Sequence, residues 1–339
     1  MKKKTKYNVA VVGAKGAVGS EMIKILEERK FPVAELRLFG SARSKGTTVR
    51  FQDCDITVRE LKFESKEFQG VDIILSSPGA SVSSKFVPHA VKAGAIIIDN
   101  TSAFRMHPKV PLVIPEINPE DIGKHKGIIA NPNCSAIIML MAIAPLHQKN
   151  RIRRVICSTY QSASGAGTKA MKELETQTRD FLEGKPIKKE IFPHQIAFNL
   201  FSHNSFIEEN GYNSEELKMI EESRKILHDD SIRMVATCVR VPVFRAHSET
   251  IYIELERKMT AQKARSILSK APGIKLVDDQ KNNHFPMPIE ASGGDDVLVG
   301  RIREDLSTKN GLALFVSGDQ LRKGAALNAV QIAEHLIQM

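Results

Sequence analysis

A cysteine at the start of a predicted helix is the clearest candidate nucleophile in the sequence. Cys134 follows an Asn-Pro-Asn triplet, in which Pro132 favours an extended backbone before it and Asn133 is a good helix N-cap. Residues 136–144 are all apolar and predict a buried helix, so Cys134 falls on its first turn. The unpaired N–H groups and the positive dipole end of that turn stabilise a thiolate and lower the pKa of the thiol. The alternative is a buried, unreactive cysteine that happens to begin a helix.

A histidine further along the chain is a candidate proton carrier for this thiol. His247 follows the strand-like residues 235–243 on a predicted loop. A histidine titrates near neutrality, and a cysteine with a distant histidine is the usual pair in nucleophilic catalysis. The chain has ten histidines, so spacing alone does not select His247 from the others.

A glycine-rich turn near the amino terminus predicts a dinucleotide site. The apolar residues 7–12 read as a strand, and apolar positions at helical spacing begin at Met22. Between them lies a G-x-x-G-x-x-G variant of the dinucleotide fingerprint. Gly13 allows the tight turn, Gly16 lets the backbone approach a pyrophosphate, and Gly19 packs the helix against the strand. The alternative is a plain strand-to-helix turn.

The end of the next predicted strand, residues 36–39, indicates which dinucleotide is bound. An NAD site places an acidic residue there for the ribose hydroxyls, whereas this chain has Ser41, Arg43 and Ser44. A guanidinium and two hydroxyls suit a 2′-phosphate, which a carboxylate would repel. The segment therefore favours NADP over NAD; the alternative is a solvated basic loop.

The order of predicted elements indicates an α/β chain of two domains. Apolar runs at 71–75 and 95–98, with a helical stretch at 82–93 between them, continue the strand–helix alternation of a parallel sheet. Later strands predict a second, mostly antiparallel sheet, and a helix is expected at about residues 319–338. The length of 339 residues is ample for two cores.

Three charged residues are further candidates with two readings each. Arg105 lies past the carboxyl end of a predicted strand, where it would clamp an oxyanion or phosphate, or lie solvated at the surface. Glu215 and Lys218 share one face of a helix that Ser214 is expected to cap. That pair would either face a ligand or form a salt bridge in water.

Composition narrows the class of protein. Hydrophobic residues make up 42% and charged residues 26%, and no run approaches the roughly 20 apolar residues of a membrane span. We expect no membrane partner and a cytoplasmic location, since no cleavable signal segment precedes the first strand. The net charge of +10 favours anionic small ligands over nucleic acid, because no dense basic stripe is present. The four scattered cysteines predict thiols rather than disulfides or a metal site: Cys54, Cys134, Cys157 and Cys238.

Ordered motifs from Val9 to the last helix resemble the aspartate-β-semialdehyde dehydrogenase family. In chain order they are Gly13-Ala14-x-Gly16-Ala17-Val18-Gly19, Ser41-Ala42-Arg43-Ser44, residues 99–105 (DNTSAFR), 131–135 (NPNCS), 161–167 (QSASGAG), Glu215-Glu216-x-Lys218, Arg240-Val241-Pro242-Val243 with His247, and 322–328 (RKGAALN). The resemblance implies a Rossmann-type NADP-binding domain at 1–133 and 318–339. It also implies an α+β catalytic and dimerisation domain with a mixed or antiparallel sheet at 134–317, in a homodimer.

The resemblance further implies a reaction. NADPH would reductively dephosphorylate L-aspartyl-4-phosphate to L-aspartate-4-semialdehyde through a cysteine thioester, toward lysine (by way of diaminopimelate), threonine and methionine. By the same resemblance Cys134 is the nucleophile, His247 the acid/base, and Gln161 positions the intermediate. Arg240 would hold the substrate carboxylate and Glu215 its amino group. The residues implied for the phosphate are Arg105, Asn133 and Lys218.

The resemblance also implies a set of cofactor-binding residues: Gly13, Lys15, Gly16, Ala17, Val18, Gly19, Ser41, Arg43, Ser44, Ser164, Gly165 and Asn328. Lys15 departs from the family, which commonly has threonine there. An additional cation near the pyrophosphate would loosen the choice between NADP and NAD.

Two rival functions remain open from the sequence. N-acetyl-γ-glutamyl-phosphate reductase has the same architecture but needs a longer pocket and no free-amine site, so Glu215 favours the aspartyl substrate. A non-catalytic NADP-binding redox sensor would keep the glycine turn, yet it has no reason to place Cys134 behind Asn-Pro-Asn.

Overall fold

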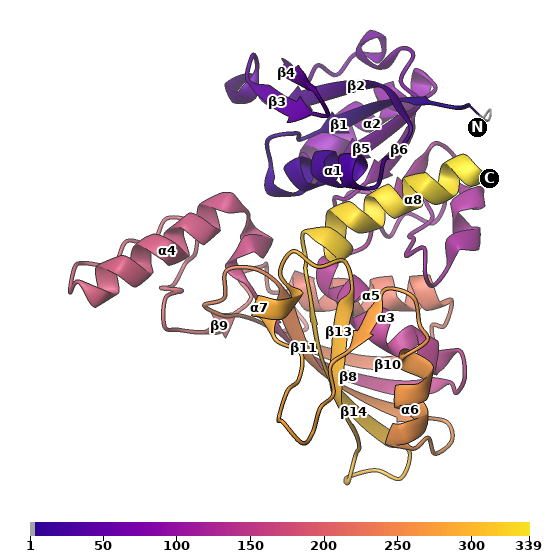
Figure 1. The fold of residues 1–339 in the computed structure, drawn as a ribbon, viewed down its shortest axis with the longest axis vertical. Helices are drawn as coiled ribbons and strands as arrows, with labels where there is room; N and C mark the ends of the chain where they lie inside the picture. Colours follow the sequence, from indigo (N-terminus) through magenta and orange to yellow (C-terminus); the bar gives the residue numbers. More distant parts are fainter. Residues whose placement is uncertain (1–3) are drawn as a thin grey trace. The chain divides into compact units, whose positions relative to one another are not determined.

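The chain passes twice between two units of a computed structural model that describes residues 4–339 (Figure 1). Unit 1 comprises Met1–Asn133 and Ala325–Met339, and unit 2 comprises Cys134–Gly324. We expected the chain to return to unit 1 at residue 318, but it returns at Ala325. Residues 319–324 stay with unit 2 because the buried Asp319 carboxylate accepts hydrogen bonds from Arg245 Nε at 2.6 Å and from the backbone N–H of Leu321 at 2.9 Å.

Unit 1 is built on a sheet with the strand order β3-β4-β2-β1-β5-β6-β7. Neighbouring strands run parallel except for the β3–β4 hairpin at one edge, so the predicted parallel α/β sheet is confirmed. The strands are β1 (Tyr7–Val12), β2 (Val33–Gly40), β3 (Thr48–Phe51), β4 (Cys54–Glu60), β5 (Ile73–Ser76), β6 (Ile96–Asp99) and β7 (Ile128–Ala130).

Helices cover both faces of this sheet, as a parallel sheet requires. They are α1 (Ala17–Glu28), α2 (Ala80–Lys92) and α8 (Leu327–Gln338). Alternate residues of β1 divide between two cores: Val9 and Val11 pack with buried residues of α1 and α8, while Ala10 and Val12 pack with those of α2. The predicted terminal helix begins later than expected, because residues 322–326 form a π-helix before α8 starts.

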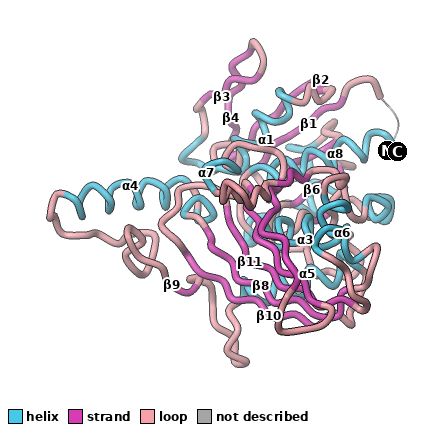
Figure 2. The backbone as a smooth tube through the Cα atoms, turned by 60° about the horizontal axis from the view of Figure 1, so that its bottom comes forward, coloured by secondary structure: helices cyan, strands magenta, loops and turns pink. Residues whose placement is uncertain are grey.

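Unit 2 contains a mixed sheet in the order β12-β13-β14-β11-β8-β10-β9. The pairs β8–β10 and β12–β13 are parallel and the other neighbours antiparallel, in agreement with the mixed or antiparallel sheet predicted here. Figure 2 shows β8, β10 and β11 side by side. The strands are β8 (Ile152–Gln161), β9 (Phe201–Ser202), β10 (Arg233–Arg240), β11 (His247–Leu255), β12 (Ile274–Leu276), β13 (Val297–Glu304) and β14 (Gly311–Gly318).

The helices of unit 2 are α3 (Cys134–His147), α4 (Thr168–Leu182), α5 (Ser214–Leu227), α6 (Ala261–Leu268) and α7 (Pro288–Ala291). Helix α3 contacts β8, β11, β13 and β14 on one side and α5 and α6 on others, which explains why its sequence is apolar all round. Helix α4 extends away from the sheet (Figures 1 and 2). Among residues 4–339, no helix combines the length and apolar character needed to cross a membrane.

Candidate active site

Three of the predicted site residues lie in one row across adjacent strands of unit 2. Gln161 ends β8 and pairs with Arg240, which ends the parallel strand β10. Ser248 pairs with Tyr160 in the antiparallel register of β11 and β8, so His247 lies beside Gln161. Paired residues point to the same face of a sheet, and the row therefore projects three polar side chains together. His247 was expected on a loop, but it is the first residue of β11.

The face that carries this row is the one on which α3 packs. His247 pairs with Gly318 of β14, and a Cβ atom added to Gly318 would lie 3.0 Å from Cγ1 of Ile138 in α3. At the start of α3 the Oγ of Ser135 accepts a hydrogen bond from Gln161 Nε2 at 3.0 Å. The sheet row and the beginning of the helix are thus joined directly.

Cys134 occupies the helix start that the sequence predicted. It is the first residue of α3 and is half-buried. The π-helix approaches it closely: a Cβ atom added to Gly324 would lie 3.0 Å from the Cβ of Cys134. Gly324 therefore lets the chain pass close to the thiol where any larger residue would displace it.

This contact makes the Gly324→Ala variant informative. The backbone of Gly324 is in a conformation that alanine adopts, but the new methyl group would press on Cys134 Cβ at 3.0 Å and on Gln320 Cβ at 3.4 Å. Cys134 is the candidate nucleophile, and a shift of a few tenths of an ångström in such a group is costly. We therefore expect kcat to fall by about tenfold or more while thermal stability changes little. Steady-state kinetics and a melting curve measure the two effects.

Gly123→Ala is the matched control for this variant. A Cβ at Gly123 would also meet a neighbour at 3.0 Å, but that neighbour is Cε at the flexible end of Met339 in unit 1. Its kcat should stay within about twofold of wild type, since the side chain can move aside. Equal losses in both variants would remove the special role assigned to Gly324.

The hydrogen bonds of His247 define its tautomer. Its Nδ1 accepts from the backbone N–H of Ser162 at 3.0 Å, and Ser162 Oγ lies 3.0 Å from the same nitrogen. A backbone N–H can only donate, so the proton of the neutral ring is on Nε2. His247 is fully buried, and Nε2 has no hydrogen-bond partner among residues 4–339. A buried N–H without a partner is rare in native proteins, and a catalytic role is one of the recognised reasons for it.

The electrostatics keep this imidazole neutral. Burial lowers the pKa of His247 to about 3, and the positive charge of Arg240 acts in the same direction. Gly165 packs over the ring: a Cβ there would lie 3.1 Å from His247 Nε2 and 2.9 Å from Arg240 Nη1. The absence of a side chain at residue 165 leaves room around both functional groups.

Arg240 presents a buried guanidinium. Its Nη1 donates to the carbonyl oxygen of Ser162 at 3.2 Å, its Nε lies 3.4 Å from Asn204 Oδ1, and its charge lies 5.8 Å from the centroid of the Phe192 ring. Burial lowers the pKa of Arg240, while the charges of Glu215 and Cys134 oppose that shift. Cys134 is therefore within electrostatic reach of Arg240, which suits a site for an anionic group.

The charged pair on α5 forms a salt bridge. Lys218 Nζ lies 3.2 Å from a carboxylate oxygen of the buried Glu215. The helix is capped by Asn213 and not by Ser214 as predicted: Asn213 Oδ1 accepts from the N–H of Glu216 at 2.9 Å, and the Glu216 carboxylate accepts from the Asn213 N–H at 3.0 Å. This reciprocal capping box fixes the first turn that carries Glu215.

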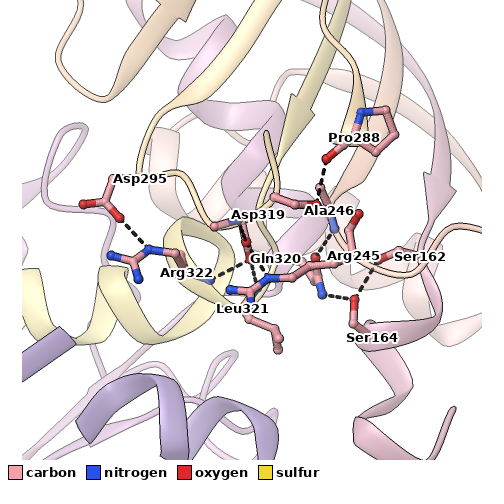
Figure 3. A network of polar contacts seen from close by, with 12 residues as sticks. Ser162, Ser164, Arg245, Ala246, Pro288, Asp295, Asp319, Gln320, Leu321 and Arg322 are labelled. Carbon is pink, nitrogen blue, oxygen red and sulfur yellow. Dashed lines mark hydrogen bonds and ion pairs between the residues drawn. The ribbon is translucent and has the colours of Figure 1, made fainter. Parts of the chain in front are cut away.

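A polar network that the sequence did not reveal supports the site (Figure 3). Gln320 donates from Nε2 to Ser164 Oγ and accepts from the N–H of Ala246 at 2.8 Å, next to His247. Ser164 Oγ lies 3.0 Å from Ser162 Oγ, which contacts the imidazole. Gln320 was placed in the predicted terminal helix, and no local sequence signal distinguishes it from a helix-surface glutamine.

The other cysteines of unit 2 are in environments that disfavour a thiolate. Burial raises the pKa of Cys157 well above its usual value, and burial also raises the pKa of Cys238. No disulfide joins cysteines in the part of the chain that the structure describes, residues 4–339. Of the three cysteines in unit 2, Cys134 alone combines a helix start with partial exposure.

Glu249 lies one row below the candidate site and is kept protonated. It pairs with Thr159 in the β11–β8 register, Cys157 Sγ lies 3.9 Å from its Oε2, and its Oε1 has no hydrogen-bond partner among residues 4–339. Burial raises the pKa of Glu249 well above its ordinary value of 4.5. In the unfolded chain the carboxyl ionises at lower pH, so stability falls as the pH rises between those two pKa values.

Glu249→Gln should therefore change the pH dependence of stability. The free energy of unfolding of the variant, relative to wild type, should rise by about 1.4 kcal/mol per pH unit between the pKa of the unfolded carboxyl and the raised pKa of the folded one. Urea unfolding followed by circular dichroism at several pH values measures this difference. Glu254→Gln, on the same strand but partly exposed, serves as control and should run parallel to wild type. If the free energy of unfolding of both variants ran parallel to that of wild type across this pH range, Glu249 would not be neutral in the folded protein.

Unit 1 contains a pocket of about 540 Å³ at the glycine turn. Three backbone segments approach one another closely in this turn, which requires glycine. Gly13 has φ +87°, a Cβ at Gly16 would lie 3.2 Å from the Gly13 carbonyl oxygen, and a Cβ at Gly19 would overlap that carbonyl. Ala17 and Val18 begin α1. The predicted cofactor residues that line this pocket are Gly13, Lys15, Gly16, Ser41, Arg43 and Ser44.

The remaining predicted residues of unit 1 surround the Asn-Pro-Asn segment. Arg105 is buried and donates from Nε to the carbonyl oxygen of Asn131 and from Nη2 to that of Asn100, both at 2.9 Å. Asn328 donates to Asn131 Oδ1 at 2.7 Å and lies outside the lining of the pocket. Asn133 is buried. The hydrogen bond from Asn328 to Asn131 fixes the segment that precedes Cys134.

Comparison with protein families places both units in one class. The family model described as semialdehyde dehydrogenase, NAD binding domain, matches residues 8–125, and the one described as semialdehyde dehydrogenase, dimerisation domain, matches residues 143–323. These two matches, together with the fold, place the chain in the class of semialdehyde dehydrogenases. Such enzymes are oxidoreductases.

Full-length relatives define the family more narrowly. Aspartate-semialdehyde dehydrogenases from Synechocystis and from Aquifex aeolicus are 54% and 51% identical, over 97% and 98% of both chains. The crystal structure of aspartate semialdehyde dehydrogenase II from Vibrio cholerae complexed with ASA is 44% identical, with a TM-score of 0.95 and 99% of each chain covered. The chain belongs to the aspartate-semialdehyde dehydrogenase family, as its ordered motifs predicted.

Proposed function

We propose that this protein reduces L-aspartyl-4-phosphate to L-aspartate-4-semialdehyde with NADPH, through a thioester on Cys134. The observation that carries the proposal is the grouping in unit 2 of a helix-start cysteine, a buried neutral imidazole and a buried guanidinium. The names of the full-length relatives, and the ASA complex of the Vibrio cholerae enzyme, support the substrate. The route to lysine, threonine and methionine follows from that substrate.

The chain's own residues divide the chemistry between them. The Cys134 sulfur attacks the acyl carbon, the carbon–oxygen bond to phosphate breaks, and phosphate leaves with that electron pair. A bound dinucleotide would supply the hydride that reduces this thioester. The resulting oxyanion then re-forms the carbonyl and expels the thiolate, while Nε2 of His247 holds or passes the proton at the reacting sulfur or oxygen. Gln161, tied to Ser135 next to the nucleophile, positions the intermediate.

Substrate recognition is assigned by charge. Arg240 takes the α-carboxylate in a bidentate manner, and Glu215 takes the ammonium group. Arg105, Asn133 and Lys218 bind the phosphate. In the structure Glu215 and Lys218 form a salt bridge with each other, and the assignment gives each of them a new partner when the substrate binds.

Most of the residues assigned to the cofactor belong to unit 1, and Ser164 and Gly165 belong to unit 2. Unit 1 binds NADP: the glycine turn takes the pyrophosphate, and Ser41, Arg43 and Ser44 take the 2′-phosphate. Lys15, Ala17 and Val18 line the start of α1 on the pyrophosphate side, and Ser164, Gly165 and Asn328 complete the cofactor set. Unit 2 carries catalysis and homodimer formation, in line with its match to a dimerisation domain. A reduced catalytic thiol fits a cytoplasmic location.

The direct test follows NADPH absorbance in the reverse direction. L-aspartate-4-semialdehyde, phosphate and NADP should give phosphate-dependent NADPH formation, whereas N-acetylglutamate semialdehyde should give little. Turnover with the acetylated aldehyde alone would keep the thioester chemistry and move the substrate. Tight NADP binding without turnover of either aldehyde would favour a dinucleotide-binding sensor.

A further inference from the structure

A carboxylate lines the cofactor pocket of unit 1 at a place that no motif assigns. Glu60 ends β4 and pairs in the parallel register with Gly40, which ends β2. It lines the same pocket as Ser41, Arg43 and Ser44. The acidic residue that dinucleotide sites place at the end of the second strand is thus present, one strand further along the sheet.

The structure explains why β2 does not carry this acid itself. A Cβ atom on Gly40 would collide with Ser44 Oγ and lie 3.1 Å from Cγ1 of Val58. Ser44 is held in that position because its Oγ donates to the carbonyl oxygen of Ser41 at 2.9 Å. The hydroxyl-bearing turn therefore excludes any side chain at residue 40, and Glu60 is the nearest strand end from which a carboxylate can reach the pocket.

The surroundings of Glu60 suit the adenosine end of a dinucleotide. Leu61 donates its N–H to the Gly40 carbonyl oxygen at 2.9 Å, which fixes the chain after β4 against the end of β2. Leu61 and Phe63 line the pocket, and Phe63 leaves 41% of its surface exposed. An exposed aromatic ring beside polar side chains suits an adenine ring and its ribose.

A lysine is already paired with the carboxylate. Lys45 Nζ lies 3.2 Å from Glu60 Oε2, and their side chains are 62% and 37% exposed. Exposed ion pairs of this kind contribute little free energy and open readily. Lys45 is not part of the pocket lining, but its ammonium group lies beside Glu60, which is. When a ligand enters, Lys45 can therefore turn to a phosphate and Glu60 to hydroxyl groups.

We propose that Glu60 and Lys45 together set the cofactor preference, so that the pocket accepts both NADP and NAD. With NAD, the Glu60 carboxylate accepts hydrogen bonds from the ribose hydroxyls. With NADP, Lys45 leaves Glu60 and joins Arg43 on the 2′-phosphate, which Glu60 repels. This proposal rests on the dinucleotide site assigned above, and it makes Glu60 the residue that limits selectivity for NADP.

The test compares the affinity of the full chain for the two dinucleotides by isothermal titration calorimetry. Glu60→Gln should weaken NAD binding and leave NADP binding equal or tighter, so that the ratio of the two dissociation constants shifts toward NADP by about tenfold or more. Lys45→Met should weaken NADP by a similar factor and leave NAD within about twofold.

The matched control is Glu304→Gln in unit 2. Glu304 forms a lysine pair of the same length, 3.2 Å to Lys258 Nζ, with side-chain exposures of 41% and 65%. Glu304 lies outside the pocket, so the ratio of the NAD and NADP dissociation constants of this variant should equal that of wild type.

An unchanged ratio in Glu60→Gln, or an equal shift in Glu304→Gln, would overturn the proposal. Failure to bind either dinucleotide would overturn it too. Turnover of L-aspartate-4-semialdehyde with NADP in the same preparations tests the proposed function separately. If turnover persists but the ratio of dissociation constants is unchanged, the proposed function stands and the role of Glu60 does not.

Discussion

Replacing Cys134 by alanine is expected to lower phosphate-dependent NADPH formation by about 10⁴-fold or more, because the only covalent route is lost. Cys134 is half-buried at the first position of α3, so removing its sulfur leaves neither a large cavity nor an unpaired buried charge. The unfolding midpoint and the affinity for NADP, which is assigned to unit 1, should change little. The rate is measured by absorbance at saturating aldehyde, phosphate and NADP.

Cys157→Ala is the control for this variant. Cys157 is fully buried in β8, and its pKa is raised by burial, so it contributes packing and not nucleophilicity. We expect a stability loss of about 1 kcal/mol and a rate within a few-fold of wild type. A similar rate loss in both variants, or persistent turnover in Cys134→Ala, would remove Cys134 from the chemistry.

The second large effect is expected for His247→Asn, with kcat reduced by about 10²- to 10⁴-fold. Asparagine Oδ1 can accept the hydrogen bond that Ser162 N–H gives to Nδ1 at 3.0 Å, so the local backbone keeps its partner. The variant lacks Nε2, the buried atom assigned to proton transfer. Because the imidazole is neutral in the folded protein, with a pKa of about 3, the substitution changes no net charge at neutral pH.

His203→Asn tests whether any nearby histidine could serve instead. The Nδ1 of His203 also accepts a backbone N–H, from Ser205 at 3.3 Å, and burial with the charge of Arg240 lowers the pKa of His203 to about 4. Its surroundings thus match those of His247, but the strand row does not include it. Its kcat should stay within about tenfold of wild type; a larger loss than in His247→Asn would reverse the assignment.

Sequence patterns predicted the elements whose signals are local. The glycine turn between β1 and α1 and the apolar helix that begins at Cys134 are both read from consecutive residues. The parallel sheet of unit 1 follows from the alternation of such elements. The candidate site residues were predicted from the family motifs, and each motif is a short run of consecutive residues.

What the sequence did not reveal depends on contacts between distant residues. Gln320 accepts the N–H of Ala246, next to His247, because β14 ends beside β11. No local sequence pattern predicts this pairing of strands. His247 was placed on a loop because Pro242 and Val243 end the preceding strand, whereas its extended backbone is fixed by pairing with Gly318. Ser214 was expected to cap α5. The cap is Asn213, because Glu216 lies three residues after Asn213 and completes a capping box with it.

Edge elements were also missed, for a physical reason. Strands β3 and β4 are largely exposed, so polar and charged residues interrupt the apolar alternation that predicts a strand. Their importance appears only in the register, where the end of β4 meets the end of β2 and brings Glu60 to Gly40.

The central claim is that Cys134 forms a thioester with the substrate. L-aspartate-4-semialdehyde and NADP, mixed with the protein without phosphate, should give a rapid burst of about one NADPH per chain and then stop, because the acyl group stays on the enzyme. Mass spectrometry of the quenched protein should locate an aspartyl group on the peptide that carries Cys134, and added phosphate should release it. A burst that is absent, or an acyl group found on another residue, would contradict the account.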